Sequence, residues 1–303
     1  MNERLPTALE WLRRQDLPAS TPARTTRAPG ARARPPSAAR LDAAPLAGLW
    51  VGADRRATSV DSIDIAERDG VCLLRVAGAD ASGPREWGVM EATPHAADVD
   101  GSIAIGGTAR YDFCFLEVTL TFFMKSGILI LCRFNRWKDD SARADCFTRE
   151  FLYRRFRQGG RTRAEGTVSG GITRGTDRPA GAPPPRIDPA PVAGRFRSCD
   201  PSTLGFAEIT VLPRDRHLEM TLIAAGGPAA DPGQVMSIRG AAFADGEHGG
   251  PAGGFLAECE SSFQRLVLAA YLNKGLLAID TFTTFLDGSG RSAYRARDHF
   301  YRA

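Results

Sequence analysis

Apolar residues alternate with polar ones in short runs along the chain, and turn-forming residues separate these runs. Residues 63–66 and 71–76 flank Asp69-Gly70, and the β-rich run 115–124 is followed after a short turn by a second run at 128–134. Alternation with period two is typical of half-buried strands, and Asp-Gly favours a hairpin turn. These parts of the chain show no good helical periodicity. The pattern therefore predicts an all-β protein built from antiparallel hairpins.

The second half of the sequence repeats the first. Residues 41–50 match 187–196 at an offset of 146, and residues 123–154 match 271–302 at an offset of 148 with nine of the 32 positions identical. The offset changes by only two residues between these segments, so the match is almost gapless. A period of this length predicts two tandem domains that arose by an internal duplication.

The composition predicts where these domains begin and end. Residues 17–40 are rich in Pro, Ala and Arg, and residues 156–186 are rich in Gly, Arg, Thr and Pro. Such segments bury too little apolar surface to offset their chain entropy, so we predict disordered linkers there. The two β-barrel-like repeats are then expected at 41–155 and 187–303. Leucines at helical spacing within 1–16 predict a short N-terminal helix, which either packs on its own domain or docks a pathway enzyme.

The positive charge of the chain is concentrated in the predicted linkers. The net charge is +4, yet residues 1–40 carry +5 and residues 156–186 carry +4, which leaves about −5 on the rest. This distribution argues against a nucleic-acid partner. No apolar run reaches the length of a membrane helix, and the N-terminus lacks the apolar core of a signal peptide. The six cysteines include no close pair, so we expect a cytoplasmic protein without a membrane partner.

The ends of each repeat carry a recognisable combination of residues. Gly48-Leu49-Trp50 opens the first repeat and Arg154 ends it, and Phe196 and Arg302 take the equivalent places in the second repeat. This combination resembles the calycin signature of lipocalins and fatty-acid-binding proteins, in which an arginine of the last strand packs over the Gly-x-Trp tryptophan. The resemblance implies two small antiparallel barrels, each with one end closed by an arginine over an aromatic ring. The repeats are shorter than lipocalins, which leaves open whether the barrels close.

A narrower resemblance extends over residues 41–303. The tandem of short calycin-like units with Arg-rich linkers looks like the peptide-binding accessory proteins of crocagin-type pathways, which build pyrroloindoline alkaloids from ribosomal precursor peptides. The resemblance implies a role in natural-product biosynthesis: the protein would hold a precursor peptide for a separate modifying enzyme.

Candidate ligand-binding residues lie mainly on the last strand of each repeat. Side chains two residues apart share one face of a strand, so an arginine and a tyrosine on one face can hold a carboxylate together. The alternative is that this face points outward, into solvent or toward neighbouring strands. Two tryptophans of the first repeat are further candidates, although most aromatic residues belong to cores. The complete candidate set is Arg149, Tyr153, Trp87, Trp137, Arg297, His299 and Tyr301.

Signatures of catalysis are missing from the sequence. The four histidines do not have metal-ligand spacing, and no Gly-x-Ser-x-Gly motif occurs. We therefore predict no catalytic residues, no metal and no cofactor, and a binding protein for a peptide or a small apolar ligand. A lipocalin-like cyclase or isomerase that shapes a reactive substrate in a dry pocket is the alternative, and a haem or bilin carrier is a third. Exposed edge strands could also pair two chains into a homodimer.

Overall fold

The computed structural model describes residues 40–53, 60–78, 85–138, 143–155, 185–215, 217–227 and 231–303. The predicted N-terminal helix and nearly all of both predicted linkers lie outside these ranges. Within them the chain is all-β, as the alternation of apolar and polar residues predicted, and its helical content is one short 3-10 helix.

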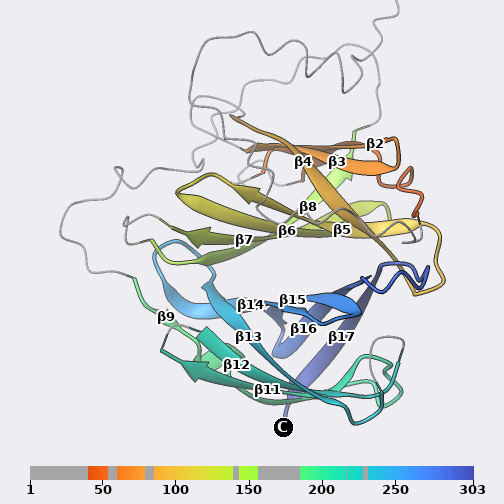
Figure 1. Cartoon of the computed structure of the whole chain (residues 1–303). Coiled ribbons are helices and arrows are strands. Elements are labelled where there is room, and N and C mark those ends of the chain that lie inside the picture. Colours follow the sequence, from red (N-terminus) through yellow and green to blue (C-terminus); the bar gives the residue numbers. More distant parts are fainter. Residues whose placement is uncertain are drawn as a thin grey trace, which may run out of the picture.

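The strands form two consecutive groups of eight, which Figure 1 shows one above the other. The first group is β1 (Gly48–Gly52), β2 (Ser62–Arg68), β3 (Val71–Gly78), β4 (Arg85–Ala96), β5 (Ala104–Asp112), β6 (Leu116–Lys125), β7 (Ile128–Trp137) and β8 (Cys146–Arg154). The short β9 (Ile187–Asp188) and the 3-10 helix η2 (Ala190–Val192) precede the second group. That group is β10 (Gly194–Ser198), β11 (Phe206–Arg214), β12 (His217–Ala224), β13 (Val235–Ala244), β14 (Gly250–Glu260), β15 (Gln264–Asn273), β16 (Leu276–Phe285) and β17 (Tyr294–Arg302).

Three tight hairpin turns are built from residues with positive backbone φ angles. The angles are 49° and 75° at Asp69-Gly70, 51° and 79° at Ser126-Gly127, and 50° and 82° at Lys274-Gly275. Two consecutive positive φ angles are characteristic of the type I′ turn, whose twist matches that of the flanking strands. Turns were expected at these three places, and they set the register of β2 on β3, β6 on β7, and β15 on β16.

In each group the strands pair in chain order, and the last strand pairs with the first. All neighbours in the first group are antiparallel and β1 pairs with both β2 and β8, so we call residues 48–154 ring 1. In the second group β10 pairs with both β11 and β17, and we call residues 194–302 ring 2. Further pairings between the rings join all strands into one 17-stranded sheet. Each strand of a ring therefore has an enclosed face and an outward face.

Three apolar clusters stabilise this arrangement. One takes residues from every strand of ring 1, from Trp50 on β1 to Leu152 on β8, so it fills the space that ring 1 encloses. A second takes residues from every strand of ring 2, from Phe196 on β10 to Phe300 on β17. The third lies on outward faces and joins β7 and β8 to ring 2. Its buried members are Cys132, Phe134, Phe147, Phe243, Ala269, Tyr271, Ala278 and Phe282.

The two rings contact each other through backbone hydrogen bonds that repeat at an interval of 148 residues. Ala96 N donates to Ala293 O at 2.8 Å, and Ala244 N donates to Asp145 O at 2.9 Å. Adding 148 to the first donor gives the second donor, and adding 148 to the second acceptor gives the first. The parallel bridges Tyr294–Ala96 and Cys146–Ala244 obey the same relation. Each contact that ring 1 makes on ring 2 is thus matched by the equivalent contact of ring 2 on ring 1, as in an isologous dimer interface.

Aromatic side chains at this interface follow the same relation. Phe134 packs edge-on against Phe243 with ring centroids 5.1 Å apart, and its equivalent Phe282 packs edge-on against His95 at the same distance. His95 is therefore the ring 1 counterpart of Phe243. Its Nδ1 contacts Thr93 O at 2.9 Å, and Nε2 lies 3.3 Å from the Thr284 hydroxyl. A titratable imidazole thus takes the place of a phenyl ring in an interface that excludes water.

His95 is expected to make the protein less stable in acid. The residue is 1% exposed, and burial lowers the pKa of its imidazole from 6.5 to about 4 against the opposing effect of the Thr93 carbonyl. The unfolded chain binds a proton more readily, so stability should fall as the pH drops from about 6.5 to 4, by about 3 kcal/mol in all. Urea unfolding of the wild type and of His95→Phe across this pH range measures the effect. The variant should lose less stability, and identical pH profiles would contradict the assignment to His95.

Candidate functional site

One end of each ring is covered by an arginine stacked on an aromatic ring. The guanidinium of Arg154 lies 4.7 Å from the Trp50 ring centroid, and that of Arg302 lies 5.0 Å from the Phe196 ring centroid. The strand register places these residues directly opposite each other, on β1 and β8 and on β10 and β17. These are the two contacts expected from the sequence. Arg154 also donates to Pro45 O, while Trp50 Nε1 donates to Leu46 O at 2.8 Å.

The glycine at the start of each motif is required by this contact. Gly48 and Gly194 have φ angles of 125° and 124°, which residues with a side chain rarely adopt. A Cβ on Gly194 would lie 2.8 Å from Nη1 of Arg302. Glycine therefore allows the first strand of the ring to pass beneath the arginine of the last strand.

The candidate residues of the last strands face away from the ring interiors. Leu152 and Arg154 point inward on β8, so Arg149 and Tyr153 point outward. Tyr153 is 49% exposed, and Tyr301 at the equivalent position of ring 2 is 45% exposed. Strand β17 follows the same rule, with His299 exposed on its outward face. The outward face is the alternative stated above, and the expected convergence of arginine and tyrosine on one cavity is not found.

Two of these candidates contribute to the contact between the rings. Arg149 of ring 1 lies with its guanidinium 4.9 Å from the Tyr271 ring centroid, and Arg297 of ring 2 lies 4.2 Å from that of Phe123. Arg149 and Arg297 are 148 residues apart, as are Phe123 and Tyr271. Each arginine thus packs on an aromatic side chain of the other ring, which is a structural role.

The candidate tryptophans Trp87 and Trp137 belong to the filling of ring 1. Trp87 is 5% exposed and packs edge-on against Tyr111 and Phe113, with centroids 5.6 Å apart in both pairs. Trp137 stacks on Phe115 at 6.3 Å. These two residues therefore lie apart from the candidates on β17, and the structure does not bring the seven predicted residues together.

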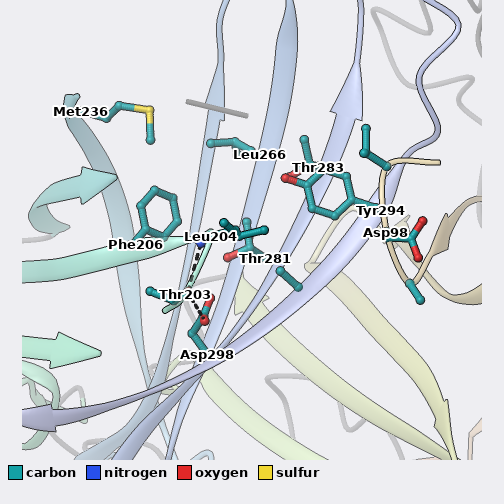
Figure 2. A pocket seen from close by; sticks show the side chains of 14 residues that line it. Asp98, Thr203, Leu204, Phe206, Met236, Leu266, Thr281, Thr283, Tyr294 and Asp298 are labelled. Carbon is teal, nitrogen blue, oxygen red and sulfur yellow. Dashed lines mark hydrogen bonds between the residues drawn. The ribbon is translucent and has the colours of Figure 1, made fainter. Parts of the chain in front are cut away.

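A cavity of about 300 Å³ lies instead in ring 2, at the end away from Arg302. Figure 2 shows Phe206, Met236 and Leu266 along one side of it, from three different strands. The loop 203–205 of ring 2 and the loop 97–99 of ring 1 also border it. The cavity is thus an enclosed space with a mainly apolar lining, completed by one loop of the other ring.

Asp298 on β17 is the buried acidic group of this cavity. Its Oδ1 accepts a hydrogen bond from the Thr203 hydroxyl at 2.7 Å, and the same hydroxyl accepts one from Gly205 N at 3.0 Å, as Figure 2 shows. A Cβ on Gly205 would lie 2.5 Å from Oδ2, so only glycine fits against the carboxylate. Burial raises the pKa of Asp298, and the hydrogen bond from Thr203 opposes this. Within the described residues, no lysine, arginine or histidine forms an ion pair with Asp298.

Comparison of the two rings shows how the cavity arises. The positions of ring 1 that are equivalent to Thr281 and Asp298 hold Arg133 and Glu150. These two side chains are 6% and 7% exposed, with Arg133 Nε 4.0 Å from Glu150 Oε1. A long arginine side chain therefore occupies in ring 1 the place that a threonine leaves open in ring 2. The repeat alignment contains this difference, although the sequence alone did not show that positions 133 and 281 face an interior.

Comparison of the sequence with models of known families and with curated proteins finds no match in either case. In the described ranges no group of three or more His, Cys, Asp and Glu residues is arranged to hold a metal ion. Nor does any helix in those ranges have the length and hydropathy needed to span a membrane.

Proposed function

We propose that this chain is a non-catalytic binding protein in which ring 2 holds a small, largely apolar group. The observation that carries the proposal is the cavity of about 300 Å³ among Phe206, Met236 and Leu266. Binding sites for small molecules are enclosed, mostly apolar spaces with a few polar groups, and this volume is at the lower end of their range. The group would be a compact small molecule or a single side chain of a peptide.

The proposal includes the origin of the two rings. We propose that they are calycin-like barrels that descend from one duplicated ancestor. The matched arginine–aromatic contacts at Trp50 and Phe196 and the interface contacts repeated every 148 residues support this origin. After the duplication, one barrel would have kept a filled interior while the other acquired a cavity.

A peptide ligand fits the surroundings of the cavity. Leu204 is 70% exposed on the loop that borders the cavity, and Asp98 of ring 1 lies exposed beside it. An anchoring side chain would enter the cavity while the peptide main chain lies across these two loops. The narrower proposal is that this peptide is a ribosomal precursor presented to a separate modifying enzyme, as the resemblance to crocagin-type accessory proteins implies.

The binding proposal predicts a local response to a small neutral probe. With methionine methyl groups labelled with ¹³C, benzyl alcohol should shift the NMR signal of Met236, which lines the cavity, and leave that of Met90 unchanged. Met90 packs against the core of ring 1 and serves as an internal control. Ala296→Phe should fill the cavity and weaken binding about tenfold or more, because a buried space is lost, whereas Ala296→Ser should bind as the wild type does. Equal shifts at both methionines, or none at either, would contradict the proposal.

A further inference from the structure

The interior of ring 1 shows how this fold neutralises an acidic group near the open end. Glu150 on β8 and Arg133 on β7 are both buried and oppositely charged. The Thr148 hydroxyl links them, because Arg133 Nε donates to it at 3.2 Å and it donates to Glu150 Oε1 at 3.2 Å. A buried carboxylate is costly unless a positive charge and hydrogen bonds compensate it. Ring 1 supplies both from its own side chains.

Ring 2 keeps the carboxylate and lacks the compensating cation. Asp298 takes the place of Glu150, while Thr281 takes that of Arg133 and Ala296 that of Thr148. The Thr203 hydroxyl gives Asp298 a hydrogen bond, and no basic side chain of the described residues pairs with it. Thr281 and Ala296 both line the cavity, so the space is open where ring 1 holds its guanidinium.

We propose that the ring 2 cavity binds a ligand with a protonated amine or guanidinium group, which pairs with Asp298 as Arg133 pairs with Glu150 in ring 1. This inference rests on the proposed binding function and adds the charge of the ligand to it. The apolar part of the ligand lies against Phe206, Met236 and Leu266, and the positive head lies at Asp298. Thr203 is a positioning residue, because its hydroxyl orients the carboxylate. A lysine or arginine side chain of a peptide and a free aliphatic or aromatic amine share this chemistry.

Two probes of the same shape and different charge test the inference on the full-length wild-type chain. Benzylamine is protonated at pH 7.5, whereas benzyl alcohol is neutral, and the Met236 methyl shift reports binding of either. Benzylamine should bind about tenfold more tightly or better, since a hydrogen bond to a charged partner is stronger than one between neutral groups. Benzyl alcohol binding as tightly as benzylamine would overturn the inference and leave the proposed function intact. No shift with either probe would overturn both.

Two substitutions separate Asp298 from other sources of negative charge. Asp298→Asn should remove the preference for benzylamine while benzyl alcohol still binds, and Asp98→Asn, at the exposed mouth, should retain it. A preference that disappears only in Asp98→Asn would overturn the assignment. Thr281→Arg should place a guanidinium opposite Asp298, as in ring 1, and prevent both probes from binding. If benzylamine binding survives Thr281→Arg unchanged, the cation does not occupy this place, whether or not Asp298→Asn folds.

The source of the positive charge is read from a second pair of probes. n-Butylamine and the blocked tripeptide acetyl-Gly-Lys-Gly-amide present the same butylammonium group, free or attached to a main chain. Tighter binding of the tripeptide identifies a lysine-bearing peptide, and tighter binding of n-butylamine identifies a free amine. Either result supports the inference, whereas failure of both, with benzyl alcohol still bound, would overturn it.

Discussion

Asp280→Ala is expected to lower the free energy of unfolding by about 3–5 kcal/mol, because it leaves two buried guanidinium groups without their partner. Asp280 is 1% exposed on the outward face of β16, and Arg295 and Arg297 have side chains that are 9% and 17% exposed. Arg297 Nε donates to Asp280 Oδ1 at 2.8 Å, and Arg295 binds the same oxygen. This carboxylate therefore compensates two cations at the contact between the rings.

The surroundings of the two arginines make other compensation unfavourable. Both guanidinium groups lie over the ring of Phe123 from ring 1, at 3.7 Å and 4.2 Å from its centroid. Burial lowers the pKa of Arg295, and Asp280 opposes this effect. Without the carboxylate, the arginines must move into water and expose Phe123, so the cost includes contact between the rings.

Urea unfolding at pH 7.5 measures this cost. Glu258→Gln is the matched control, because Glu258 pairs with Arg110 of ring 1 across the same interface but both side chains are more than a third exposed. The control should cost less than about 1 kcal/mol. If Asp280→Ala is no more destabilising than Glu258→Gln, Asp280 does not hold the rings together.

Trp50→Ala is expected to have an effect of similar size, about 3–5 kcal/mol, because it removes one of the largest fully buried side chains. Trp50 is 1% exposed, and its loss leaves the Arg154 guanidinium above a void and Leu46 O without its donor. Arg154→Met keeps most of the apolar contact and removes the charge, so it should cost less, about 0.5–2 kcal/mol. Thermal and urea unfolding of both variants give the comparison. A larger loss in Arg154→Met than in Trp50→Ala would mean that the arginine, and not the tryptophan, closes this end of ring 1.

Much of the local structure was determined by the sequence alone. Alternating polarity predicted the strands, and residues that accept positive φ, such as Asp69-Gly70 and Lys274-Gly275, predicted the turns between them. The contact of Trp50 with Arg154 was also predictable. These features depend on residues close in sequence or on a recognisable pair, so little knowledge of the remaining chain was needed.

Only the tertiary structure decided which face of each strand is enclosed. Period two separates the side chains of β8 into two sets but does not say which set points inward. Both sets contain apolar and charged residues, because the other ring buries the outward Phe147 while ring 1 encloses Glu150. Arg149 and Tyr153 were therefore as plausible inside the ring as outside it, and they lie outside.

The position of the cavity likewise depends on distant residues. Asp298 and Thr281 become a candidate site only when the antiparallel pairing of β16 with β17 directs both to the enclosed face, with Thr203 and the loop 97–99 brought alongside. An empty space is the absence of a side chain, here the absence of an arginine at position 281, and a single sequence does not reveal it. Local patterns thus determined the strands and turns, whereas the packing of distant segments decided where a ligand can enter.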